Sequence, residues 1–228
     1  MRFASLAEWL AWQESLHPKT IDLGLERVDE VYRNLGLANG SHPYTITVAG
    51  TNGKGSCVAM LDAILRAEGY RTGTYTSPHL LRYNERVVIE GVQISDAELC
   101  EAFARIDAVR KDASLSFFEF GTLAALDIFA RSALDVQILE VGLGGRLDAV
   151  NLVDADIALI AGIDLDHQSY LGDTREAIGY EKAGIFRAGK PAILGDVDVP
   201  QSVLNHAAKL GIELDSLGQT FSYQVKPQ

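Results

Sequence analysis

In the first third of the chain, hydrophobic residues recur first at the spacing of helices, then as the short run typical of a strand, and then again at helical spacing. Residues 6–16 and 25–35 carry apolar side chains three or four positions apart, which predicts two amphipathic helices. Residues 44–49 form a short β-branched run bounded by proline and glycine, as expected of a buried strand. Residues 57–66 return to the helical period, so the order is helix, helix, strand, helix.

The alternation continues through the rest of the chain. The segments 135–141 and 157–161 are almost wholly apolar, which suits strands that are covered on both faces. Alternating strands and helices predict an α/β fold with a largely parallel sheet flanked by helices. We expect further strands over 71–76, 86–90, 191–194 and 220–225, and helices from a capping box at Ser95 to Val109 and over 118–130, 177–185 and 200–210.

Composition narrows the classes of function. The chain has 228 residues, 47% of them hydrophobic, which is enough for a large core. A formal net charge of −11 without any Lys/Arg run argues against a nucleic-acid partner. The two cysteines form no CxxC pair, so neither a disulfide framework nor a zinc site is indicated. With no membrane-length apolar stretch and no signal peptide, we expect a cytoplasmic monomer that acts on small molecules.

A glycine-rich segment joins the strand at 44–49 to the next helix. Glycines let backbone N–H groups converge on phosphate oxygens at a helix N-terminus, a lysine adds a full charge, and a serine hydroxyl can reach magnesium. The strict G-x-x-x-x-G-K-[ST] spacing is not met, which disfavours Ras-like GTPases and ordinary P-loop kinases. The alternative is a tight strand-to-helix turn that binds nothing. The segment reads Gly50-Thr51-Asn52-Gly53-Lys54-Gly55-Ser56.

Several motifs in order carry a resemblance that spans nearly the whole chain. The glycine-rich segment, Thr76-Ser77-Pro78-His79-Leu80 and Tyr83-Asn84-Glu85-Arg86 closely resemble the bifunctional dihydrofolate synthase/folylpolyglutamate synthase family, which belongs to the Mur-ligase-like ATP-dependent amide ligases. Further matches lie at 20–27, 118–121, 139–149, 166–167 and 181–186.

The resemblance implies a P-loop-containing, Mur-ligase-like ATP-binding domain over residues 1–228. Members of the family normally carry a second, C-terminal Rossmann-like domain, and nothing in this sequence corresponds to it. We therefore expect the first domain to be incomplete at its C-terminal end. We also expect the chain by itself to show little or no ligase turnover.

The activity implied by the resemblance uses ATP and Mg²⁺. It adds L-glutamate to dihydropteroate, and further glutamates to folates, through an acyl phosphate. One alternative is an ATP/Mg²⁺-binding module without ligase activity. A second alternative is a Mur ligase of cell-wall synthesis, whose loop also reads Gly-Thr-Asn-Gly-Lys but typically continues with threonine, whereas this chain has Gly55-Ser56.

The resemblance also assigns site residues. It gives the ATP phosphates to Gly50–Ser56, magnesium to Ser77, Glu140 and His167, and further catalytic roles to Lys54 and Lys182, the second matching a lysine that is carbamylated in Mur-type ligases. The pterin-bearing substrate falls to Asp22, Leu23, Gly24, Ser116, Phe117, Phe118, Glu119, Leu147, Asp148 and Ala149.

The residues by themselves support these assignments unequally. Glu140 ends an apolar strand just before a glycine turn, where α/β sheets place functional side chains, and an unpaired carboxylate is costly to bury there. Without the resemblance, His167 would be read as a surface or core histidine and Ser77 as part of a Ser-Pro turn. Lys182 would be read as a solvated lysine, and the pair Phe117-Phe118 as core.

Overall fold

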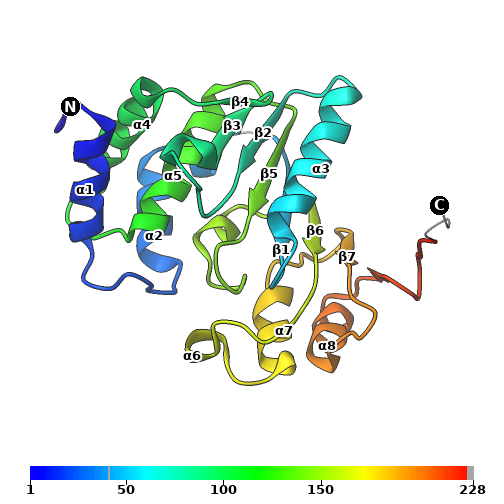
Figure 1. Ribbon diagram of the computed structural model, residues 1–228. Coiled ribbons are helices and arrows are strands. Elements are labelled where there is room, and N and C mark those ends of the chain that lie inside the picture. The colour runs from blue at the N-terminus through cyan, green and yellow to red at the C-terminus, as the bar shows by residue number, and fades with distance from the viewer. Residues whose placement is uncertain (41, 225–228) are drawn as a thin grey trace.

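A mostly parallel sheet runs through the middle of the molecule (Figure 1). The computed structural model describes residues 1–40 and 42–224. The strand order across the sheet is β4-β3-β2-β5-β1-β6-β7-β8. The strands are β1 (Tyr44–Ala49), β2 (Thr72–Tyr75), β3 (Val87–Ile89), β4 (Val92–Gln93), β5 (Val136–Glu140), β6 (Ile157–Ile160), β7 (Ala192–Leu194) and β8 (Leu214–Ser216).

Strand direction confirms the largely parallel sheet. Every pairing from β2 through β5, β1, β6 and β7 to β8 is parallel, whereas β3 and β4 are antiparallel. The apolar runs 135–141 and 157–161 form β5 and β6 on either side of β1. The carboxyl ends of these central strands meet at one edge, which is where ligands bind in open α/β sheets.

Helices cover both faces of the sheet, as Figure 1 shows. Helix α3 packs on the face formed by β1, β2 and β5. Helices α1, α2, α4 and α5 form a layer on the opposite face, and α7 packs on α8. The helices are α1 (Leu6–Leu16), α2 (Glu26–Asn34), α3 (Lys54–Ala67), α4 (Asp96–Val109), α5 (Phe117–Arg131), α6 (Gln168–Leu171), α7 (Arg175–Ala183) and α8 (Gln201–Leu210), with 3₁₀ turns η1 (Leu37–Asn39), η2 (Tyr83–Arg86) and η3 (Ala149–Leu152).

Capping boxes lie at the starts of α1, α4 and α5. Ser95 caps α4 by accepting a hydrogen bond from the backbone N–H of Glu98, whose side chain accepts in return, as predicted. Ser116 and Glu119 form the same box at the start of α5. The cap at Ser116 orients the first turn of α5, which faces the candidate site.

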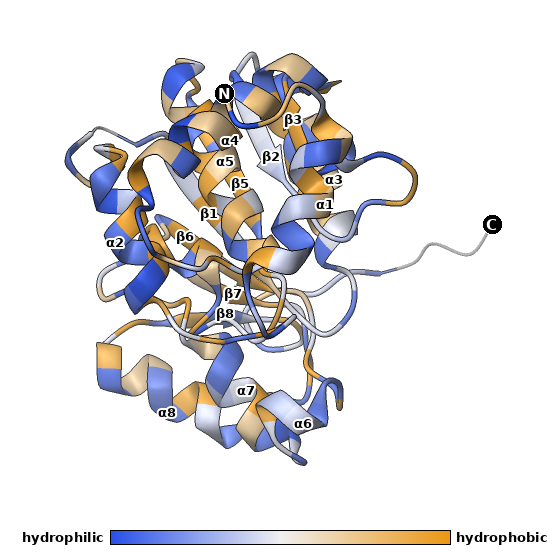
Figure 2. Ribbon diagram, turned by 90° about the vertical axis from the view of Figure 1, so that its left-hand side faces the viewer, coloured by the Kyte–Doolittle hydropathy of each residue, from blue (hydrophilic) through white to orange (hydrophobic). Residues whose placement is uncertain are grey.

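Two apolar clusters hold the layers together. The larger lies between the sheet and the helices α1, α2, α4, α5, α7 and α8, and it includes the fully buried Trp9, Phe103 and Phe120. The smaller lies under α3 and joins Val58 to Ile138. Figure 2 shows the mostly hydrophobic α5 in the middle of the molecule against the sheet.

The structure departs from the expected elements at the end of the described chain. A strand was expected over 220–225, but residues 220–224 contribute a single isolated bridge between Leu217 and Phe221, and residue 225 lies outside the described residues. The edge strand is β8 instead, which pairs with β7. This strand has three residues, two of them polar, so hydrophobic periodicity could not reveal it. Ile185, expected within a helix, follows the end of α7 and is fully buried.

No helix within residues 1–40 and 42–224 has the length and apolar character needed to cross a membrane.

Candidate functional site

The glycine-rich loop connects β1 directly to α3. Gly53 caps α3 with a left-handed backbone, φ 83°, so that Lys54 is the first helical residue. A side chain at Gly50 would bring its Cβ within 3.1 Å of the Cβ of Ala161. Glycine is therefore required at both positions, and the first N–H groups of α3 are left facing the carboxyl edge of the sheet, where an anion can bind them.

Contacts with the end of β6 hold the loop in place. The Thr51 N–H donates to the carbonyl of Gly162 at 2.9 Å. The Thr51 hydroxyl donates to the carbonyl of Asp164 at 3.0 Å and accepts from the Asp164 N–H at the same distance. Asn52, Gly55 and Ser56 are exposed to solvent. Thr51 thus holds the loop, while its neighbours remain accessible to a phosphate.

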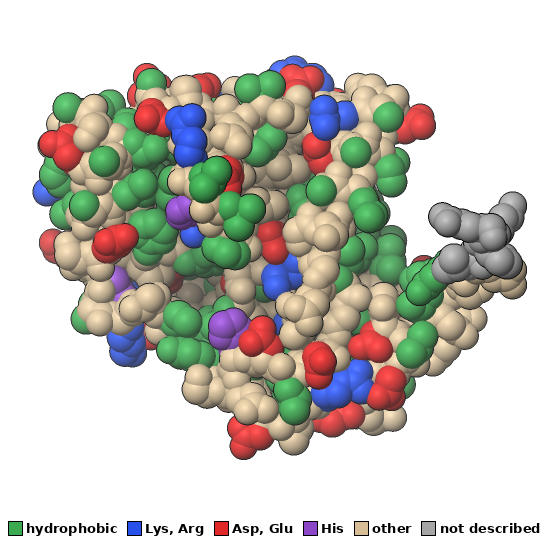
Figure 3. Space-filling model, viewed as in Figure 1, with side chains coloured by type: hydrophobic (Ala, Val, Ile, Leu, Met, Phe, Trp, Pro, Cys, Tyr) green, Lys and Arg blue, Asp and Glu red, His purple; other side chains and the backbone are tan. Residues whose placement is uncertain are grey.

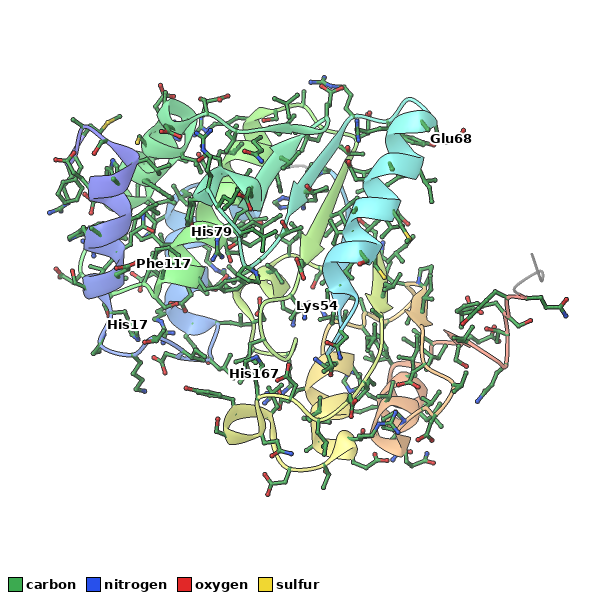
Figure 4. The ribbon with its side chains drawn as sticks, viewed as in Figure 1. His17, Lys54, Glu68, His79, Phe117 and His167 are labelled. Carbon is green, nitrogen blue, oxygen red and sulfur yellow. The ribbon has the colours of Figure 1, made fainter. Side chains whose placement is uncertain are left out.

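Lys54 lies at the lower end of α3 in Figure 4. Its ammonium donates to the carbonyl oxygens of Gly50 at 3.0 Å and Thr51 at 3.4 Å. These two bonds keep the charge folded over the loop rather than extended into solvent.

Glu140 is the last residue of β5 and is buried, with 4% of its surface exposed. Its Oε2 accepts a hydrogen bond from the Ser77 N–H at 3.0 Å. A side chain at Gly55 would lie 3.9 Å from both carboxylate oxygens, so the carboxylate faces the first turn of α3. Burial raises the pKa of Glu140, while the Ser77 bond, Lys54 and Arg86 oppose that rise.

His167 caps the start of α6 and lies below Lys54 in the view of Figure 4. Half of its side chain is exposed, and its backbone is left-handed, with φ 46°. Its N–H donates to Asp166 Oδ1 at 2.8 Å. The side chain borders the cavity described below together with Ser77, so two of the three expected magnesium ligands share one wall.

Lys182 is not the solvated lysine that its position beside Glu181 suggests. It lies in the last turn of α7 and is only 3% exposed. No salt-bridge partner lies within 4.0 Å of its ammonium among the residues that the structure describes. Burial, and secondarily the charge of Lys54, lower the pKa of Lys182 to about 8.

We expect Lys182→Met to stabilise the protein at pH 7 in buffers free of carbon dioxide. The folded chain releases the Lys182 proton near pH 8, whereas the unfolded chain holds it to about 10.5, so burial of the charge costs about 3 kcal/mol below pH 8. Wild-type stability should rise relative to the variant as the pH increases from 8 to 10.5. Urea unfolding at pH 7 and pH 9.5 measures both effects, and a wild type that is the more stable protein at pH 7 contradicts them.

A cavity of about 250 Å³ is lined by Ser77, whose N–H binds Glu140. Figure 3 shows a hollow in this face, bordered by hydrophobic, charged and histidine side chains. Three segments far apart in the sequence form most of the cavity wall, namely the loop before α2, the start of α5 and the turn before η3. Ser77, Pro78, Arg86 and His167 complete it. Nine of the ten residues expected to hold the pterin-bearing substrate line it: Asp22, Leu23, Gly24, Ser116, Phe118, Glu119, Leu147, Asp148 and Ala149.

Phe117 is the exception to the expected set. It does not line the cavity but packs edge-on against Tyr83, with ring centroids 5.6 Å apart and the Arg86 guanidinium 5.7 Å from its ring. Consecutive helical residues point about 100° apart, so Phe117 and Phe118 cannot both face one wall. Phe118 lies against Gly142, where a Cβ would come within 2.6 Å of its ring.

Asp148 is a buried carboxyl in the cavity wall. Its oxygens accept hydrogen bonds from the N–H groups of Leu143 at 2.8 Å and Val150 at 3.0 Å. Burial nevertheless raises the pKa of Asp148 to about 6. The cavity wall therefore contains a buried carboxyl whose protonation state is sensitive to mild acidity.

Sequence reasoning gave no role to Arg86, which also lines the cavity. It is 9% exposed and its Nε donates to His79 Nδ1 at 2.9 Å. The available signal was its position within the Tyr83–Arg86 motif, which was used for the resemblance but not for the site. Five further lining residues were not assigned to the substrate: Thr20, Ile21, Pro78, Gly142 and Leu143.

Among the expected metal ligands, Glu140 offers the ligand type that magnesium prefers, a carboxylate. Within residues 1–40 and 42–224 no three His, Cys, Asp or Glu side chains gather into a metal cluster. Magnesium commonly binds through one or two protein carboxylates together with phosphates and water. The buried carboxylate of Glu140, facing a phosphate-binding helix end, is compatible with that mode of binding.

Comparison with known proteins agrees with this geometry. The model of the Mur ligase middle domain matches residues 48–220. The dihydrofolate synthase/folylpolyglutamate synthase of Escherichia coli K12 is 51% identical over 220 residues, covering 96% of this chain and 52% of that protein. The chain therefore spans about half the length of the curated relatives that it matches.

Two solved structures superpose closely. Escherichia coli FolC in complex with DHPP and ADP has a TM-score of 0.95 and 51% identity, over 98% of this chain and 54% of that one. A bifunctional folylpolyglutamate synthase/dihydrofolate synthase with Mn, AMPPNP and L-glutamate bound has a TM-score of 0.91 and 53% identity, over 97% and 54%. This chain belongs to the Mur ligase middle domain family, and the comparisons confirm its resemblance to the dihydrofolate synthase/folylpolyglutamate synthases within it.

Proposed function

We propose that this chain forms the ATP- and pterin-binding part of a ligase that joins L-glutamate to dihydropteroate and to folates. The observation that carries the proposal is the position of the Glu140 carboxylate. It accepts the N–H of Ser77, which lines the cavity, and it also faces Gly55 at the start of α3, where a Cβ would lie 3.9 Å away. The solved relatives with DHPP and ADP, and with AMPPNP and L-glutamate, support the choice of ligands.

The reaction requires a carboxylate and a triphosphate to approach each other. The substrate carboxylate attacks the γ-phosphorus of ATP, forming an acyl phosphate and releasing ADP. The amine of glutamate then attacks the acyl carbon, forming the amide and releasing phosphate and a proton. Both reactants of the first step are anionic, so alignment and charge neutralisation dominate the catalysis.

Each part of this chain has a role in that first step. The N–H groups at the start of α3 and the Lys54 ammonium bind the phosphates. The cavity holds the flat ring system against Phe118 and directs the carboxylate toward the loop. Magnesium bound by Ser77, Glu140 and His167 would neutralise phosphate charge.

Lys182 would act on this site indirectly. Carbamylation joins the neutral amine to carbon dioxide with loss of a proton and turns a buried cation into an anion. A pKa of about 8 supplies the neutral amine at mildly alkaline pH. Carbon-13 NMR in labelled bicarbonate would detect the carbamate, and a spectrum without that signal would remove this role.

Ligand binding separates the proposal from its alternatives. We expect 7,8-dihydropteroate to bind the 228-residue chain at least about tenfold more tightly than a UDP-muramyl peptide, because the wall is apolar and offers Asp148 to a heterocycle. Titration calorimetry in the presence of ATP and Mg²⁺ measures both affinities. Preference for the muramyl peptide would favour a cell-wall ligase. Binding of ATP alone would favour a nucleotide-binding module.

A further inference from the structure

An arginine outside the cavity joins two segments of the cavity wall. Arg27 lies in the first turn of α2 and does not line the cavity. Its Nη1 donates to Asp22 Oδ2 at 2.6 Å, and its Nη2 donates to the backbone carbonyl of the same residue. Its Nε donates to Glu119 Oε2 at 3.0 Å, while Nη2 lies 2.8 Å from Glu119 Oε1. One guanidinium therefore binds the loop before α2 and the first turn of α5.

Because these side chains are partly or fully buried, loss of their contacts should cost more free energy than loss of a surface ion pair. The side chains of Arg27 and Asp22 are 26% and 22% exposed, and that of Glu119 only 4%. Glu119 Oε2 also accepts the Ser116 N–H at 2.8 Å. Oε2 of Glu119 thus accepts two hydrogen bonds within the protein, whereas the buried Oε1 makes no hydrogen bond and is held only by its ion pair with Arg27. A buried carboxylate that loses its partner is costly, whereas an exposed pair contributes little.

A second contact joins the loop before α2 to the segment that precedes α5. The ring of His17 lies between Ser114, 3.0 Å from its Nδ1, and Asp22 Oδ2, 3.1 Å from its Nε2. Figure 4 shows His17 at the start of the loop that leads away from α1. The Gly24 N–H joins this loop to the third wall segment through the carbonyl of Leu147, at 3.4 Å.

We propose that Arg27 is a positioning residue for the pterin-bearing substrate, holding the loop of residues 20–24 against the start of α5 so that the cavity keeps the shape of a flat ring system. This inference rests on the proposed function for the identity of the ligand. Glu119 then serves the substrate by anchoring Arg27 through Oε2. The phosphate loop, which lies on other elements, does not depend on Arg27.

The test compares Arg27→Met with Arg33→Met in the 228-residue chain. Arg33 lies on the same helix in an exposed i,i+4 pair with Asp29 and is the matched control. We expect Arg27→Met to weaken 7,8-dihydropteroate binding about tenfold or more while ATP affinity changes less than about twofold. Arg27→Lys retains the charge but loses the planar guanidinium, so its affinity for 7,8-dihydropteroate should lie between those of the wild type and Arg27→Met. Arg33→Met should match the wild type.

Hydrogen exchange in the absence of ligand provides a second readout. Arg27→Met should accelerate exchange in peptides from 17–24 and 114–119 and leave α3 unchanged. Wild-type affinity for dihydropteroate in Arg27→Met would overturn the inference and leave the proposed function intact. A wild-type chain that does not bind dihydropteroate would overturn the proposed function instead, and exchange would then decide whether Arg27 holds the wall. If Arg27→Met does not fold, both measurements are made on Arg27→Lys, where unchanged values overturn the inference.

Discussion

ATP binding to this chain should weaken by about 100-fold or more in Lys54→Met, equivalent to a loss of about 3 kcal/mol. Lys54 begins α3, and its ammonium already lies over the loop through the carbonyls of Gly50 and Thr51. An anion bound at the start of the helix would therefore meet a full positive charge that is in place before binding. Methionine keeps the length of the side chain but removes that charge.

Titration calorimetry with ATP measures this effect, and Lys209→Met provides a control. Lys209 is an exposed lysine in the last turn of α8. Circular dichroism should show that both variants keep their helices. An ATP affinity in Lys54→Met equal to that of the wild type would remove the phosphate-binding role of the loop.

Glu140→Gln should abolish the strengthening of nucleotide binding by Mg²⁺, a loss that we expect to reach about 100-fold at saturating metal. The amide preserves the shape of the side chain but is a much poorer ligand for a hard cation. The same substitution should leave the metal-free protein as stable as the wild type or more stable, because the carboxylate is 4% exposed and its burial raises its pKa. Lost metal response together with retained stability is the pattern expected of a functional residue.

Glu68 is the matched control for Glu140. It lies at the far end of α3 from Lys54 (Figure 4) and is exposed, so Glu68→Gln should retain the full response to Mg²⁺. The measurement is ATP affinity as a function of Mg²⁺ concentration, with urea unfolding for stability. A Glu140→Gln protein that retains the Mg²⁺ response would exclude Glu140 as a ligand.

Long apolar segments and helix caps made most elements predictable. The expected strand over 44–49 coincides with β1, and the capping box at Ser95 begins α4 as expected. Weakly patterned segments were not predictable, because their structure depends on neighbours. Thus β8 forms only by pairing with β7, and the expected strand at 220–225 is not formed over the residues described.

In the candidate site, too, some features could be predicted from the sequence and others could not. Motif order was enough to predict most of the cavity residues, because the resemblance covers the three segments that form most of the wall. It could not distinguish Phe117 from Phe118, since adjacent helical residues differ in direction and only the packing of α5 decides which one faces the cavity. Nor could it show that Lys182 is buried, because the sequence of α7 does not indicate which other elements pack over this side chain.

By itself, the sequence determined the alternation of strands and helices, the glycine-rich loop that joins β1 to α3, and the family. These properties are encoded in residues that lie close together along the chain. Tertiary structure alone decided which side chains share an environment, as in the contact of Arg27 with both Asp22 and Glu119. Glu119 lies 92 residues from Arg27. Such contacts, and the pKa of buried groups such as Lys182, depend on the distance and solvent exposure that packing creates.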